Sequence, residues 1–109
     1  MKTQPTAAGT TAGNEAHEQE GYVLLSFRAA WCGSCHIMEP VIRDVQQQFN
    51  TELKIISLDY DQSPEAIRRY HIRETPTMIL LKNGKEKDRI AGTIPRITLK
   101  ERLQQHLDQ

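Results

Sequence analysis

The chain has 109 residues, with 14 basic and 14 acidic side chains and two cysteines, both within one tetrapeptide. A domain of this length buries roughly two-thirds of its unfolded surface and folds without disulfide staples, so the cysteine pair is expected to be chemical rather than structural. The balanced charge argues against nucleic acid or anionic lipid as a partner, and no apolar run reaches the roughly 20 residues that span a bilayer.

Residues 1–21 are rich in Thr, Ala, Gly, Gln and Glu. Such a composition buries too little apolar surface to offset the entropy of ordering, so a flexible N-terminal tail is predicted, with one domain at 22–109. The first 20 residues lack the apolar core of a signal peptide. The expected location is therefore the cytoplasm, or an exported one if a leader has been removed.

Apolar patterning predicts the elements of the first half of the domain. The run YVLLSF at 22–27 has the composition of a central strand, and residues 34–49 carry an apolar residue at every fourth position, as an amphipathic helix does. A second strand is expected at 54–61. These three elements predict a parallel crossover.

The second half begins with the stretch Ser-Pro-Glu at 63–65, which supplies the cap, first-turn proline and acid of a short helix ending at Tyr70. An Asn-Gly pair within 76–92 predicts a hairpin. Thr98 and Glu101 form an expected capping box for a closing helix. The whole order predicts an α/β open sheet that ends in an antiparallel hairpin.

The stretch WCGSCH at 31–36 has two chemical interpretations, a C-x-x-C dithiol and a C-x-x-C-H haem attachment site. A helix that starts at Cys32 would lower its thiol pKa from about 8.5 toward 7 or below, and would place Cys35 one turn away to resolve a mixed disulfide. A haem usually needs a second axial ligand, but Met38 lies too close to His36 on one helix to reach the opposite haem face. The dithiol interpretation is favoured.

Residues 22–109 resemble the thioredoxin family. The matching residues lie in the motif, the strands and the turns: Phe27, Ala29, Trp31, Cys32, Gly33, Cys35, Pro40, Asp61, Tyr70, Ile72, Arg73, Thr77, Asn83, Gly84 and Gly92. The resemblance implies a thioredoxin-like fold, with a central four-stranded mixed sheet flanked by helices and without the family's usual first strand. It also implies a cis Thr75-Pro76 bond that faces the dithiol.

The same resemblance implies a substrate-docking patch around the sulfur of Cys32. Its expected members come from the motif and from two later turns: Trp31, Gly33, Ser34, Thr75, Pro76 and Gly92.

Five side chains near the motif depart from the family pattern: Ser26, Arg28, Ser34, His36 and Ser57. The family has a buried Asp at the first of these, so Cys35 is expected to lose its proton to water, substrate or another base. Arg28 is expected to stabilise the Cys32 thiolate, to pair with Asp61, or to remain solvated. Ser34 and an exposed His36 are expected to make the couple more oxidising than about −270 mV.

The predicted function is a thiol–disulfide oxidoreductase that reduces protein disulfides and is recharged by a donor resembling thioredoxin reductase. A redox-linked client-binding or chaperone-like module with little turnover is the alternative. No cofactor is expected, and no second Cys or His pair has the spacing of a zinc site. The protein is expected to act as a monomer.

Overall fold

The computed structural model describes residues 20–109. The predicted tail, and the prediction that no strand precedes residue 22, therefore fall almost wholly outside the described residues. Only the end of that segment is described. Gly21 is bound to the hairpin turn there, because its N–H donates to Asn83 Oδ1 at 2.6 Å and its carbonyl accepts from Asn83 N at 2.9 Å.

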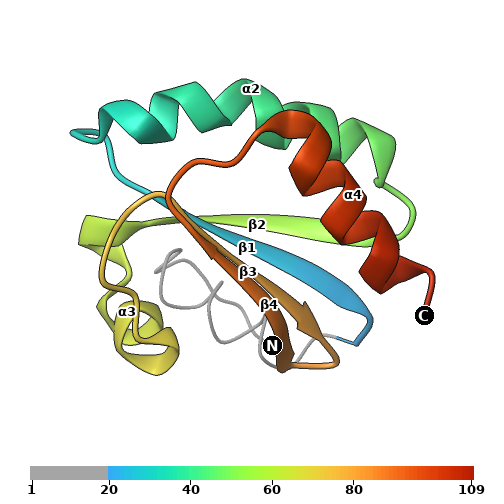
Figure 1. Ribbon diagram of the computed structural model, residues 1–109. Coiled ribbons are helices and arrows are strands. Elements are labelled where there is room, and N and C mark those ends of the chain that lie inside the picture. Colours follow the sequence, from blue (N-terminus) through green and yellow to red (C-terminus); the bar gives the residue numbers. More distant parts are fainter. Residues whose placement is uncertain (1–19) are drawn as a thin grey trace.

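Residues 20–109 form one mixed sheet with helices on both faces (Figure 1). The strands are β1 Tyr22–Arg28, β2 Leu53–Asp59, β3 Thr77–Lys82 and β4 Lys85–Ala91. The helices are α2 Gly33–Gln48, the 3-10 turn η1 Tyr60–Gln62, α3 Pro64–Tyr70 and α4 Arg96–Leu107. The strand order is β2-β1-β3-β4, parallel between β1 and β2 and antiparallel at the other two pairings. The predicted four-stranded α/β fold is confirmed.

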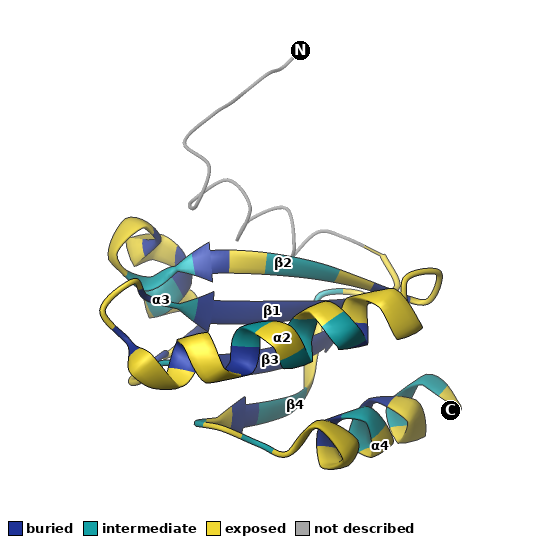
Figure 2. Ribbon diagram, turned by 90° about the horizontal axis from the view of Figure 1, so that it is seen from above, coloured by how far each residue is buried: buried dark blue, intermediate teal, exposed yellow. Residues whose placement is uncertain are grey.

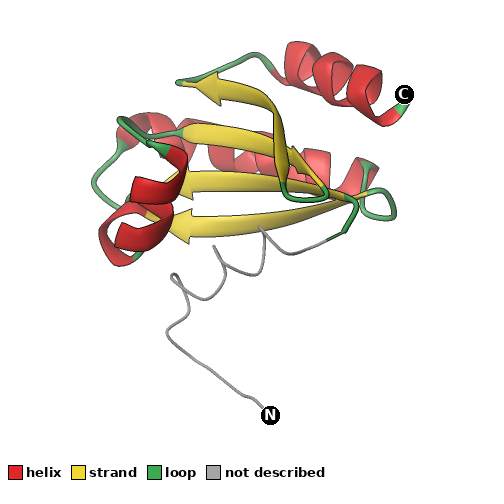
Figure 3. Ribbon diagram, turned by 90° about the horizontal axis from the view of Figure 1, so that it is seen from below, coloured by secondary structure: helices red, strands yellow, loops and turns green. Residues whose placement is uncertain are grey.

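Strand β1 is buried along nearly its whole length, as its apolar sequence predicts (Figure 2). Successive side chains alternate between faces. Leu25 and Phe27 therefore pack in the core beneath α3, on the face seen in Figure 3, while Leu24 packs in the core beneath α2 and α4. Two apolar layers thus hold the carboxyl end of β1, where the motif begins, in a fixed place.

Two boundaries differ from those predicted. The second strand ends at Asp59 rather than 61, because the Asp59 carboxylate accepts from the N–H of Asp61 at 2.9 Å and starts η1. The closing helix begins at Arg96 with Pro95 as its N-cap, so the predicted capping box is wrong and Thr98 lies inside α4. Pro95 supplies the preset φ that suits a helix start. None of the described helices has the length and apolar character needed to cross a membrane.

Candidate active site

The two cysteines stand where β1 leads into α2. Cys32 is the N-cap residue of α2, with extended backbone angles, and its sulfur accepts the backbone N–H of Cys35 at 3.1 Å. The two sulfurs form a disulfide. Cys32 is 7% exposed and Cys35 is 2% exposed, so Cys32 is the member of the pair nearer the surface. Unpaired N–H groups at a helix start stabilise a negative charge, so a thiolate is favoured at Cys32.

A second segment lies against Cys32 from the loop before β3. The Thr75-Pro76 peptide bond is cis, as the resemblance implied, and the carbonyl oxygen of Thr75 is 3.5 Å from Cys32 Sγ. The end of β4 holds this loop, since the N–H of Gly92 donates to the Pro76 carbonyl at 2.7 Å. Gly92 has a φ of +91°, a conformation that favours glycine.

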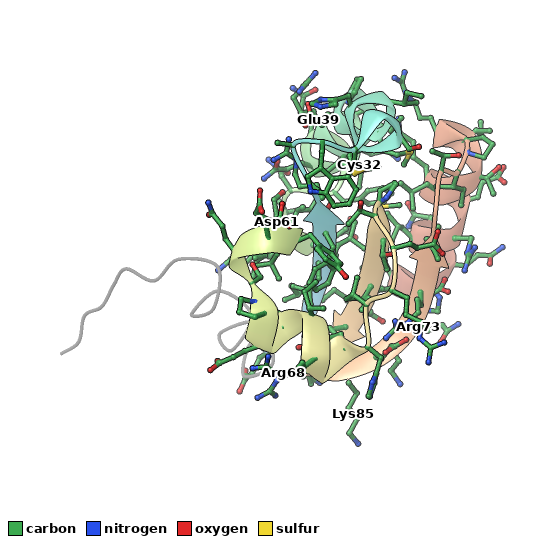
Figure 4. The ribbon with its side chains drawn as sticks, turned by 90° about the vertical axis from the view of Figure 1, so that its left-hand side faces the viewer. Cys32, Glu39, Asp61, Arg68, Arg73 and Lys85 are labelled. Carbon is green, nitrogen blue, oxygen red and sulfur yellow. A yellow bond between two sulfur atoms is a disulfide. The ribbon has the colours of Figure 1, made fainter. Side chains whose placement is uncertain are left out.

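The single tryptophan stands beside the disulfide and is held from one side. Trp31 is 66% exposed, yet its indole N–H donates to Asp61 Oδ2 at 2.8 Å. Its ring meets the edge of Tyr60 with centroids 6.3 Å apart. Figure 4 shows Asp61 across from the start of α2. Sequence reasoning missed Tyr60, although its place next to Asp61 after a strand was a usable signal.

Arg28 pairs with a residue that the sequence argument did not consider. Its Nη2 donates to Glu39 Oε2 at 2.6 Å. The predicted pairing of Arg28 with Asp61 is therefore wrong, because the Asp61 carboxylate accepts from Trp31 instead. Glu39 follows Cys35 by four residues and so shares its helix face, a spacing that could have drawn attention to it.

His36 is exposed, as predicted, but it has two defined neighbours. Its Nε2 lies 3.3 Å from the carbonyl oxygen of Ala30, and its Nδ1 lies 3.8 Å from Glu39 Oε2. A carbonyl only accepts hydrogen bonds, so Nε2 is the donor in this contact, and Nδ1 is the nitrogen that faces Glu39. Gly33 and Ser34 lie at the exposed start of the same helix.

A hollow of about 440 Å³ lies on the inner side of Cys35. Ser26 and Ser57 are register partners on β1 and β2, and both line it. The lining also includes apolar and charged side chains: Phe27, Arg28, Met38, Glu39, Ile42, Arg43, Gln46, Ile55 and Pro76. Thus the two serines that depart from the family pattern lie together, next to Cys35.

Most of the predicted site residues fall into two groups. In the outer group, Cys32, Thr75, Pro76 and Gly92 are linked by the contacts above. Trp31 precedes Cys32 in the chain and is held by Asp61. The inner group consists of Ser26, Arg28 and Ser57, which line the hollow with Cys35. Within residues 20–109, no cluster of three or more Cys, His, Asp or Glu side chains is placed to hold a metal ion.

Comparison with known proteins supplies the family. The sequence model of the Thioredoxin family matches residues 8–105, so the match begins earlier than the residue 22 that we expected. Thioredoxin 1 of Nostoc sp. is 31% identical over 107 residues, which cover 98% of this chain and 100% of that protein. Thioredoxin 1 of Synechococcus elongatus is 32% identical with the same coverage. Thioredoxin M-type, chloroplastic, of Pisum sativum is 35% identical over 78% of this chain and 49% of that protein.

A cysteine pair at the start of a helix, bonded as a disulfide and packed against a cis-proline loop, together with these relatives, defines the class of this protein as a protein-disulfide oxidoreductase. The chain belongs to the thioredoxin family.

Proposed function

We propose that the protein reduces disulfide bonds in other proteins through a mixed disulfide on Cys32. The Cys32 thiolate attacks one sulfur of the substrate disulfide, and the other substrate sulfur leaves as a thiolate that takes a proton from water. Cys35 then attacks the Cys32 sulfur, which releases the second substrate thiol. Two electrons pass to the substrate, and the Cys32–Cys35 disulfide remains.

The observation that carries this proposal is the position of Cys32 as the N-cap of α2. The backbone N–H of Cys35 points at its sulfur from 3.1 Å, so this sulfur is the better stabilised as a thiolate. Cys35 is more deeply buried and already bonds to Cys32 in the oxidised form. These differences support an attacking role for Cys32 and a resolving role for Cys35.

We further propose that an extended segment of the substrate docks between Trp31 and the Thr75-Pro76 loop. Trp31 is 66% exposed and gives this surface apolar contact area. An added Cβ at Gly33 or Gly92 would meet no atom within 4 Å, so open space lies over both glycines. That space leaves room for a peptide backbone to approach Cys32.

The oxidised protein must be reduced again after each turnover. We propose a protein donor that resembles thioredoxin reductase and docks on the same surface as the substrate, with the protein acting as a monomer. The Cys32–Cys35 disulfide would accept its two electrons.

Insulin reduction with dithiothreitol as the electron source tests the proposal. We expect the wild-type protein to accelerate insulin reduction, and we expect Cys32→Ser and Cys35→Ser to lose multiple-turnover activity. Each variant removes one of the two sulfurs needed for exchange. If both variants kept the wild-type effect on insulin, the client-binding module would be the correct function instead.

A further inference from the structure

The resolving step needs a route for the proton of Cys35. Cys35 is 2% exposed, and burial disfavours a thiolate unless a nearby group takes the proton. The neighbouring strand positions offer only the hydroxyls of Ser26 and Ser57. A hydroxyl passes a proton on but does not hold it at neutral pH, so a base must lie further along.

Glu39 is the only carboxylate among the side chains that line the hollow beside Cys35. It lies four residues, about one helical turn, after Cys35 and therefore on the same face of α2. The hollow measures about 440 Å³ and has hydroxyl, amide and charged groups in its wall, which makes it suitable for water. One or more water molecules would therefore join the Cys35 thiol to this carboxylate.

The two oxygens of Glu39 have different surroundings. Oε2 accepts from Arg28 Nη2 at 2.6 Å and lies 3.8 Å from His36 Nδ1. Oε1 has no hydrogen bond to any residue of the described part of the chain. Arg28 thus orients the carboxylate through one oxygen and leaves the other available to water. A base oriented by a third group is the usual arrangement in nucleophilic enzymes.

We propose that Glu39 is the base that takes the Cys35 proton during resolution of the mixed disulfide. This inference rests on the proposed function and extends it to one step. The Cys35 thiol gives its proton through water to Oε1 of Glu39. The Cys35 thiolate then attacks Cys32, forming the Cys32–Cys35 bond and breaking the bond to the substrate sulfur. The Glu39 side chain is 34% exposed, so its carboxyl group returns the proton to solvent.

Positively charged side chains near Glu39 favour loss of the proton from Cys35. Arg28 and His36 are the cationic or ionisable groups recorded within ion-pair distance of Glu39, and Arg43 lines the same hollow from α2. The two arginines favour a negative charge in the hollow, which includes the Cys35 thiolate once its proton has left.

An aromatic disulfide that releases a coloured thiolate separates the two chemical steps. Reduced protein releases the first thiolate when Cys32 attacks, and the second when Cys35 resolves the mixed disulfide. For Glu39→Gln we expect a first phase within twofold of wild type and a second phase slower by about 100-fold, the lower end of what general base catalysis contributes. Added formate should restore the second phase, because a small carboxylate fits the hollow.

Two further variants make the test specific. Glu39→Asp should keep part of the second-phase rate, and Glu101→Gln, which changes an exposed carboxylate on α4, should leave both phases unchanged. A second phase of Glu39→Gln that equals or exceeds the wild-type rate would overturn the inference. Equal slowing of both phases without formate rescue would also overturn it, since that pattern indicates a structural role. The absence of a first phase in wild type would instead refute the proposed function.

Discussion

Trp31 shows how single residues outside the dithiol prepare the surface for a substrate. The indole is mostly exposed, yet a hydrogen bond to Asp61 and an edge contact with Tyr60 hold it on one side of Cys32. A side chain that is already ordered loses less entropy when a partner binds. We therefore expect Asp61 to act on docking through Trp31, since it has no hydrogen bond to either cysteine.

Asp61→Ala should weaken protein docking and leave the chemistry unchanged. Loss of one hydrogen bond worth about 1 kcal/mol predicts a roughly fivefold higher KM for insulin. The rate with the small aromatic disulfide should not change, because that substrate does not need the indole surface. Asp108→Ala, at the end of α4, is the matched control. An unchanged KM for insulin, or an equal loss with both substrates, would contradict this role.

Among single residues, local features were predicted better than contacts between side chains. The pairing of Cys32 with Cys35 and the cis bond at Pro76 are confirmed, because each belongs to a short pattern or a family resemblance. The partner of Arg28 was not predicted, because two carboxylates, Asp61 and Glu39, were within reach along the chain. Only the three-dimensional arrangement shows that Trp31 binds Asp61, whereas Arg28 binds Glu39.

Helix α4 is fixed to the sheet by a polar cluster rather than by apolar packing alone. The Asp88 carboxylate on β4 binds the guanidinium of Arg102 and lies 3.1 Å from His106 Nε2. Tyr22 on β1 donates its hydroxyl to the His106 carbonyl at 2.7 Å. Burial alone would raise the pKa of Asp88, but hydrogen bonds from Arg102, the Arg89 N–H and His106 together outweigh it and hold the pKa below its ordinary value.

Asp88→Asn should lower the free energy of unfolding by about 2 kcal/mol at pH 7, because it weakens several hydrogen bonds to a charged acceptor. The pKa of Asp88 is depressed in the folded state, so its contribution is present above the unfolded pKa of about 3.9 and is lost as the pH falls further. Urea unfolding at several pH values should show that the free energies of unfolding of wild type and Asp88→Asn become equal below about pH 4.

The matched control is Asp44→Asn on α2. Asp44 pairs with Lys100 and Arg96 of α4 at 2.9 and 3.3 Å, but at a more exposed position. Asp44→Asn should lower the free energy of unfolding less than Asp88→Asn does, since exposed ion pairs contribute little. An Asp88→Asn protein as stable as wild type at pH 7 would show that α4 is held by its apolar face.

Element boundaries were predicted less well than element types, for a physical reason. The amphipathic period of α2 and the Asn-Gly turn before β4 are strong local signals. The start of α4 depends instead on whether Pro95 or Thr98 caps it, and both are compatible with the local sequence. In the structure Pro95 is the N-cap, with extended backbone angles and no side-chain capping hydrogen bond.

For the whole molecule, the order of apolar runs was sufficient to predict an α/β sheet with one parallel crossover and an antiparallel hairpin. The hollow beside Cys35 could not be predicted in the same way. Its walls come from β1, β2, α2 and the loop before β3, and its volume depends on how small side chains such as Ser26 and Ser57 meet across two strands. Such a space is a property of packing rather than of any segment.

The central claim is that Cys32 forms a covalent bond with the substrate and that Cys35 breaks it. Trapping the mixed disulfide tests this claim most directly: Cys35→Ser is incubated with insulin and the products are digested and weighed by mass spectrometry. We predict an insulin adduct on Cys32 that dithiothreitol releases, and no adduct in Cys32→Ser. Absence of any adduct on Cys32, or an adduct on Cys35 in the Cys32→Ser protein, would contradict the account.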